Sequence, residues 1–112
     1  MRTASRAMNR EIDNRIRKIG ERLRKEYGAE EVILFGSYAT GDATEDSDVN
    51  ILVVAPTTER FLERMATVKR LIRDLRHGLP VAPIVLTTEE MADRKRAQDP
   101  FIREILETGV TI

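Results

Sequence analysis

The sequence predicts an α/β (α+β) fold in which helices pack on a small mixed sheet of three or more strands. Short apolar runs at 31–35, 48–55 and 80–86 alternate with segments whose apolar residues recur at helical spacing. Apolar residues make up 41% of the chain and charged residues 34%, which suits a hydrophobic core under a charged surface. The 112 residues contain no repeat or linker, so we expect a single domain over residues 1–112.

The first half of the chain begins with a predicted helix over residues 8–27. Its apolar residues recur at steps of four, three and four, which marks one inward face, and Gly28 follows where a helix end favours a left-handed residue. The apolar run 31–35 is too short for a helix and suits a strand covered on both faces. Residues 36–47 combine glycines, hydroxyls and acids, which predicts a turn, a short helix and a loop.

The second half is predicted to form a strand over 48–55, a helix over 59–76, a strand over 80–86 and two short helices that begin at a capping box in 87–90 and at Asp99-Pro100. Pro56 ends the first of these strands. Pro83 cannot donate a ladder hydrogen bond, so it indicates an edge strand, a bulge or a strand that begins late. We expect Phe101, Ile105 and Leu106 to dock on the sheet.

The charge balance argues against a general nucleic-acid or membrane binder, because Lys plus Arg and Asp plus Glu both number 19. Without cysteine and with one histidine, His77, the chain cannot build a thiolate or histidine zinc site. No apolar run approaches the length that spans a bilayer, so we expect a cytoplasmic protein. An RNA contact remains open for four arginines of the first helix: Arg15, Arg17, Arg22 and Arg24.

The element order places Gly36 and Ser37 at the end of one predicted strand and Asp48 at the start of the next. A glycine followed by serine lets the backbone approach an anion, and it offers N–H groups and a hydroxyl to phosphate oxygens. An acid on a neighbouring strand can hold a divalent cation such as Mg²⁺ against the same phosphates. Asp48 could also simply end a strand, but together with the turn it predicts a triphosphate site.

The segment Gly36-Ser-Tyr-Ala-Thr-Gly41, followed by Ser47-Asp48-Val-Asn50, resembles the signature of minimal nucleotidyltransferases, relatives of DNA polymerase β. The resemblance implies the polymerase β-like nucleotidyltransferase fold. It implies ATP or another nucleoside triphosphate as substrate, Mg²⁺ as cofactor, and transfer of a nucleoside monophosphate, above all AMP, to a hydroxyl of a protein or nucleic acid. It places Gly36 and Ser37 at the nucleotide, and Asp48 and Asn50 at the metal as catalytic residues.

Two positions depart from the family pattern. The second acid of the Asp-x-Asp motif is Asn50, and the third carboxylate, expected on the next strand, falls at or beside Ala82. An asparagine oxygen can ligate a cation but carries no charge, and losing one metal forfeits roughly a thousandfold in rate. Thr40 also stands where many family members carry arginine. Natural loss of the acids and deliberate replacement would both produce this sequence.

Two functions therefore remain open. The first is a nucleotidyltransferase whose activity is impaired at Asn50 and Ala82. The alternative is a catalytically inactive nucleotide-binding or antitoxin-like module, because the resemblance implies a helical toxin of the HEPN type as its partner. A short sheet with exposed edges also leaves pairing into a homodimer open.

Overall fold

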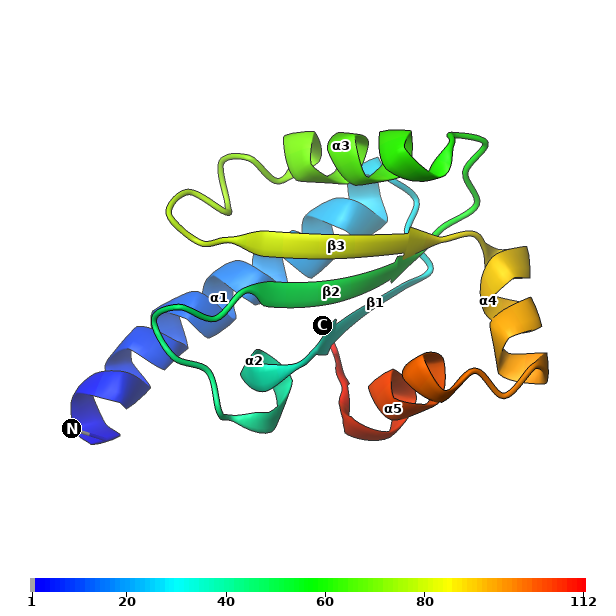
Figure 1. Ribbon diagram of the computed structural model, residues 1–112. Helices are drawn as coiled ribbons and strands as arrows, with labels where there is room; N and C mark the ends of the chain where they lie inside the picture. Colours follow the sequence, from blue (N-terminus) through cyan, green and yellow to red (C-terminus); the bar gives the residue numbers. More distant parts are fainter. Residues whose placement is uncertain (1) are drawn as a thin grey trace.

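The computed structural model describes the backbone of residues 2–112 and the side chains of residues 10–112 (Figure 1). The elements are α1 (Arg2–Glu26), β1 (Glu31–Phe35), α2 (Ser37–Thr40), β2 (Val49–Val54), α3 (Phe61–Leu71), β3 (Val81–Leu86), α4 (Thr88–Arg96), α5 (Pro100–Thr108) and β4 (Val110–Thr111). The strands form one mixed sheet in the order β3-β2-β1-β4. β1 is antiparallel to β2 and β4, and β2 is parallel to β3. This confirms the predicted fold class.

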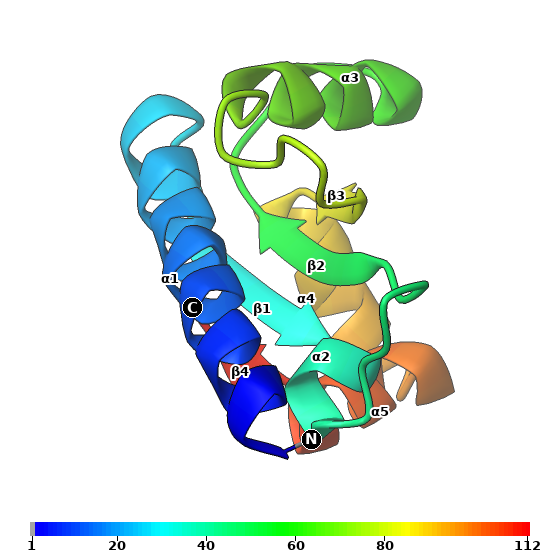
Figure 2. The ribbon, with the colours of Figure 1, turned by 90° about the vertical axis from the view of Figure 1, so that its left-hand side faces the viewer.

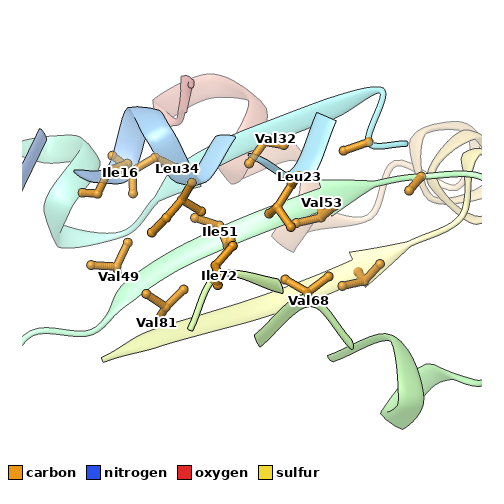
Figure 3. Close-up of a cluster of buried hydrophobic side chains, with 14 of the residues drawn as sticks. Ile16, Leu23, Val32, Leu34, Val49, Ile51, Val53, Val68, Ile72 and Val81 are labelled. Carbon is orange, nitrogen blue, oxygen red and sulfur yellow. The ribbon is translucent and has the colours of Figure 1, made fainter. Parts of the chain in front are cut away.

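The sheet is covered on both faces, with α1 and α3 on one side and α4 and α5 on the other (Figure 2). The alternation of side chains along β2 explains this arrangement. Ile51 and Val53 join the first cluster, which also contains Leu23 of α1 and Val68 of α3 (Figure 3). Leu52, the residue between them, points into the second cluster. A central strand buried on both faces has to be continuously apolar, as its sequence is.

The helices differ in length from the sequence-based expectation. α1 begins at Arg2, six residues before the predicted start at residue 8, because no glycine or proline interrupts the intervening residues. α3 ends at Leu71 instead of residue 76. Beyond it the chain tightens, and the Leu75 amide donates to the Ile72 carbonyl at 2.9 Å. Ile72 nevertheless stays fully buried. The helical spacing of the apolar residues therefore predicted its burial correctly, but it predicted too long a helix.

Two arginines of α1 stabilise this tightened end of α3. Arg15 donates from Nε to the Leu75 carbonyl at 2.9 Å, and Arg22 donates to the Leu71 carbonyl at 2.9 Å. Arg22 also forms a two-pronged pair with Asp74 at 2.8 and 3.0 Å. Helix C-termini leave carbonyls without helical partners, and these guanidinium groups supply them. Arg15 and Arg22 are thus engaged within the protein, which weakens their case as RNA contacts.

The two edges of the sheet are formed by β3 and β4. β3 pairs only with β2 and is therefore an edge strand, which was one of the three possibilities that Pro83 indicated. β4 was not predicted, because two residues carry no periodicity. Gly109 allows it to form, since a Cβ there would lie 2.4 Å from the Ile105 carbonyl oxygen. No helix among residues 2–112 is long and apolar enough to cross a membrane.

A buried arginine joins α3, β3 and α4. Arg64 is only 8% exposed, and it donates to the Val85 carbonyl at 3.3 Å and to Glu90 at 2.7 Å. Glu90 also accepts from the Thr87 amide at 2.9 Å, which completes the predicted capping box of α4. The bond from Arg64, followed by that from Thr87, lowers the pKa of Glu90 below its usual value. One carboxylate therefore both caps a helix and neutralises a buried cation.

We expect Glu90→Gln to destabilise the fold by about 1 kcal/mol at pH 7, since the carboxylate is partly solvated and the amide still accepts from Thr87. A lowered pKa means that the carboxylate stabilises the fold above the unfolded value of about 4.3, and that this stabilisation disappears as the pH falls through the folded pKa. The cost should therefore shrink as the pH falls below the unfolded value of about 4.3. Urea unfolding at pH 7 and at successively lower pH measures it. Glu89→Gln, on the same helical turn but exposed, is the matched control, and an equal cost for both variants would contradict this role.

Candidate functional site

The turn between β1 and α2 is built on Gly36. Its φ of 78° and ψ of −155° lie in a region that side chains rarely adopt. A Cβ at this position would also lie 2.7 Å from Nδ2 of Asn50 on the neighbouring strand. The Gly36 carbonyl accepts from the amides of Ala39 and Thr40 at 3.0 and 3.2 Å, which starts the short helix α2. Glycine is therefore needed here both for the turn and for the close approach of Asn50.

Asn50 lies in a row of three residues across the sheet. In the strand register it is opposite Phe35 of β1 on one side and Ala82 of β3 on the other. Their neighbours Val49 and Val81 point into the cluster under α1 and α3, so by alternation Asn50 and Ala82 face the other side. Partners on adjacent strands lie about 5 Å apart. An acid at position 82 would consequently stand next to residue 50, where the family pattern expects one.

This row lies at the end of the face that α4 and α5 leave open. These helices pack over Leu52 and Val54, further along β2, while Asn50 is only half-buried. Asp48, which immediately precedes β2, is exposed. The β2 register with β1 thus brings the Gly36 turn, Ser37 and Asn50 together at an accessible end of these strands, and Asp48 adjoins Asn50 in the chain.

The loop between α2 and β2 is held by its own side chains. The Thr44 amide donates to Oγ of Ser47 at 2.8 Å, and the Ser47 amide returns a bond to the Thr44 carbonyl at 3.1 Å. Oγ1 of Thr40 donates to the Asp42 carboxylate at 2.9 Å. Asp42 is thereby tied to α2, so the structure gives no sign that it replaces one of the missing carboxylates.

The ligands at this end of β2 do not fit a two-metal centre. Within residues 10–112 no group of three or more histidine, cysteine, aspartate or glutamate side chains is placed to hold a metal ion. This end of β2 offers one carboxylate, Asp48, and one amide, Asn50. Mg²⁺ often binds through one or two carboxylates together with the phosphates of a substrate. The donor set therefore fits a single cation delivered with a nucleotide, and no second ion.

A hollow of about 250 Å³ adjoins the turn on the side of α5. It is lined by Phe35, Gly36, Thr40, Phe101, Glu104, Ile105 and Thr108. Of the apolar residues of α5 that were expected to dock on the sheet, Ile105 is buried, and Phe101 packs against Phe35 of β1 but stays 45% exposed. Leu106 is 44% exposed, because an apolar side chain in a short helix does not reveal which neighbour covers it. The hollow depends on tertiary packing, and sequence reasoning missed it.

Comparison with known proteins places the chain in a family. The family description "Nucleotidyltransferase domain" matches residues 16–111. Two similar proteins from Methanocaldococcus jannaschii are named "Putative protein adenylyltransferase". One is 33% identical over 72% of this chain and 76% of its own length, and the other is 38% identical over 70% and 72%. The "Protein adenylyltransferase MntA" of Thermococcus cleftensis is 41% identical over 47% of this chain and 57% of its own.

A solved structure shares the architecture. It is the crystal structure of a "putative nucleotidyltransferase" from Sulfolobus solfataricus, with a TM-score of 0.52 and 28% identity over 90% of this chain and 84% of that one. The match confirms the predicted fold, and the family match confirms the predicted enzyme class. With its Gly-Ser turn and Asp-x-Asn motif brought together at one end of the central strands, the chain belongs to the nucleotidyltransferase domain family.

Proposed function

We propose that this chain binds a nucleoside triphosphate, above all ATP, with its phosphates against the Gly36-Ser37 turn and a Mg²⁺ ion at Asp48 and Asn50. Its reaction is transfer of AMP to a hydroxyl of a protein, at a rate reduced by Asn50 and Ala82: the hydroxyl oxygen bonds to the α-phosphorus, the bond to the β-phosphate breaks, pyrophosphate leaves and the hydroxyl proton passes to water. The observation that carries the proposal is the 2.7 Å between Asn50 Nδ2 and the space a Gly36 Cβ would occupy. The names of the Methanocaldococcus and Thermococcus relatives support adenylyl transfer to protein.

Each residue has a distinct part in this proposal. Gly36 lets the backbone come close to the phosphates, and Ser37 offers them a hydroxyl and an amide. Asp48 supplies the negative charge that retains the cation, and Asn50 adds a neutral oxygen. The bound cation would neutralise charge that develops on the phosphates during transfer. Without a carboxylate at position 82, nothing in the row Phe35, Asn50 and Ala82 removes a proton from an acceptor hydroxyl.

The same two positions favour a second function, binding without chemistry. Nucleotide binding needs the turn and one cation, whereas transfer needs the ligands that Asn50 and Ala82 do not supply. In that case the chain would serve as a binding module for a partner protein, and a helical HEPN-type toxin is the candidate that the family resemblance offers. A nucleic-acid acceptor is less favoured, because the charge is balanced and Arg15 and Arg22 bind carbonyls of α3 and its continuation.

Restoring the missing acids should restore transfer. We expect an Asn50→Asp, Ala82→Asp variant to label a co-expressed partner from α-labelled ATP about a thousandfold faster than the chain as it stands. Adding Asp48→Asn to that variant should abolish the gain. Equal labelling by the unaltered chain would show that other acids hold the metal. If neither labels any partner although both bind ATP, the binding-module function is the correct one.

The same double variant should depend on a cation for its stability. Its two new carboxylates would lie side by side on adjacent strands, where like charges repel. We expect Mg²⁺ at millimolar concentration to raise the melting temperature of the variant by several degrees, and to leave the unaltered chain within about one degree. Thermal unfolding with and without Mg²⁺ measures this without any acceptor. An equal response of both proteins would mean that residues 50 and 82 do not share an ion.

Removing the Ser37 hydroxyl should weaken nucleotide binding without harming the fold. A hydrogen bond to a charged phosphate contributes about 1.5–3 kcal/mol, so Ser37→Ala should raise the Kd for MgATP roughly tenfold or more. Isothermal titration calorimetry gives the Kd, and the melting temperature without nucleotide serves as the control for folding. Ser47→Ala is the matched comparison, because that hydroxyl binds the Thr44 amide within the loop. An unchanged Kd for Ser37→Ala would remove this residue from the site.

A further inference from the structure

We infer that the hollow between the Gly36 turn and α5 holds the base of the bound nucleotide, and that Glu104 selects a base that carries an amino group. The inference rests on the proposed function, because it requires a triphosphate at the Gly36-Ser37 turn. It adds two residues, Phe101 and Glu104, that lie outside the Gly-Ser and Asp-x-Asn motifs.

The hollow is continuous with the proposed phosphate site. Gly36 forms part of its wall, and Thr40 of α2 forms another part. Phe35 of β1 faces α5 and is paired with Asn50 of β2, so it lies between Asn50 and the hollow. Across the sheet the order is therefore Ala82, Asn50, Phe35 and then the hollow. If the cation lies near Asn50 and the phosphates lie on the turn, the hollow is on the side of the turn away from the cation, where the rest of the nucleotide can extend.

The size and walls of the hollow suit a base. At about 250 Å³ it lies below the roughly 300–1,000 Å³ of sites that enclose whole drug-sized ligands, so it accommodates one ring system and not a complete nucleotide. Phe101 is 45% exposed there, and its ring meets that of Phe35 edge to face, with 5.8 Å between centroids and 89° between planes. Exposed aromatic rings provide stacking surfaces for bases of any kind. Phe101 would thus contribute affinity without selecting a base.

Glu104 supplies the selectivity. Phe101, Glu104 and Thr108 are spaced by three and four residues, so they share one face of α5, the face that lines the hollow. The Thr108 hydroxyl donates to the backbone carbonyl of Glu104 at 2.9 Å and not to its carboxylate. Arg103 pairs with Glu107 within α5, and Arg94 of α4 pairs with Asp99, which caps α5. Among residues 10–112 no ion pair uses Glu104, so its carboxylate can accept from a ligand.

An ionised carboxylate only accepts hydrogen bonds. It pairs with the exocyclic amino group of adenine or cytosine, and it repels the carbonyl oxygen that uracil carries at the position of the cytosine amino group. Cytosine and uracil have the same ring size, so comparison of CTP with UTP isolates the effect of the amino group from that of stacking.

The test measures the Kd of MgATP, MgCTP and MgUTP by titration calorimetry. We expect the unaltered chain to bind CTP about tenfold more tightly than UTP. A ratio of this size is what one good hydrogen-bonded contact to a base contributes to discrimination. Glu104→Gln should bring this ratio close to one, because an amide can also donate to the uracil carbonyl. Phe101→Leu should weaken all three nucleotides about tenfold and keep the ratio. Glu107→Gln and Leu106→Ala, exposed on the same helix outside the hollow, are the matched controls and should change nothing.

The outcomes separate the inference from the function on which it rests. If no nucleoside triphosphate binds, the proposed function fails and the base site fails with it. If the nucleotides bind but CTP and UTP bind equally, or if the Phe101 and Glu104 variants behave like their controls, the base site alone is wrong. A change in the affinity for an acceptor protein, with nucleotide affinities unaltered, would assign the hollow to the acceptor and would also overturn the inference. Circular dichroism confirms that each variant is folded.

Discussion

The structure depends on the pairing of β2 with its two neighbours. β2 lies inside the sheet, antiparallel to β1 and parallel to β3, and residues 51–55 are buried. Removal of this apolar surface from water on both faces drives the layers together, and a shift of one residue would exchange the two faces. The same register sets Asn50 beside Phe35 and Ala82 and brings the Gly36 turn against it. The geometry of the candidate site is thus a consequence of the core.

Coverage of the sheet decides where chemistry is possible. α1 and α3 close one face, whereas α4 and α5 cover the other face only partly, which leaves the end with Asn50 accessible. That end presents the Gly36-Ser37 turn and one carboxylate, Asp48, while Asn50 and Ala82 stand where the family pattern expects acids. The backbone geometry of this end and the charges on it are separable: the strand register sets the first, and individual side chains set the second.

Many of the charged residues serve the fold and not a ligand. Arg15 and Arg22 satisfy carbonyls at the end of α3, and Arg64 joins α3, β3 and α4 through Glu90. In the sequence these arginines look like any solvated helix face, because a spacing pattern does not distinguish an arginine that bonds within the chain from one that faces water. A buried arginine with several acceptors shows its role only once the acceptors, distant in sequence, are in place.

The sequence by itself determined the fold class, the main strands, the helix caps at Thr87 and Asp99 and the family, because each depends on local spacing or on a short motif. It also located the Gly36-Ser37 turn and the absence of two acids. Only the tertiary structure decided that Ala82 lies directly beside Asn50, that α3 ends at Leu71, that Gly109 admits a fourth strand, and that Phe101 and Glu104 line a hollow next to the turn. These features arise from contacts between residues far apart in the chain, and no local pattern encodes which distant segments will meet.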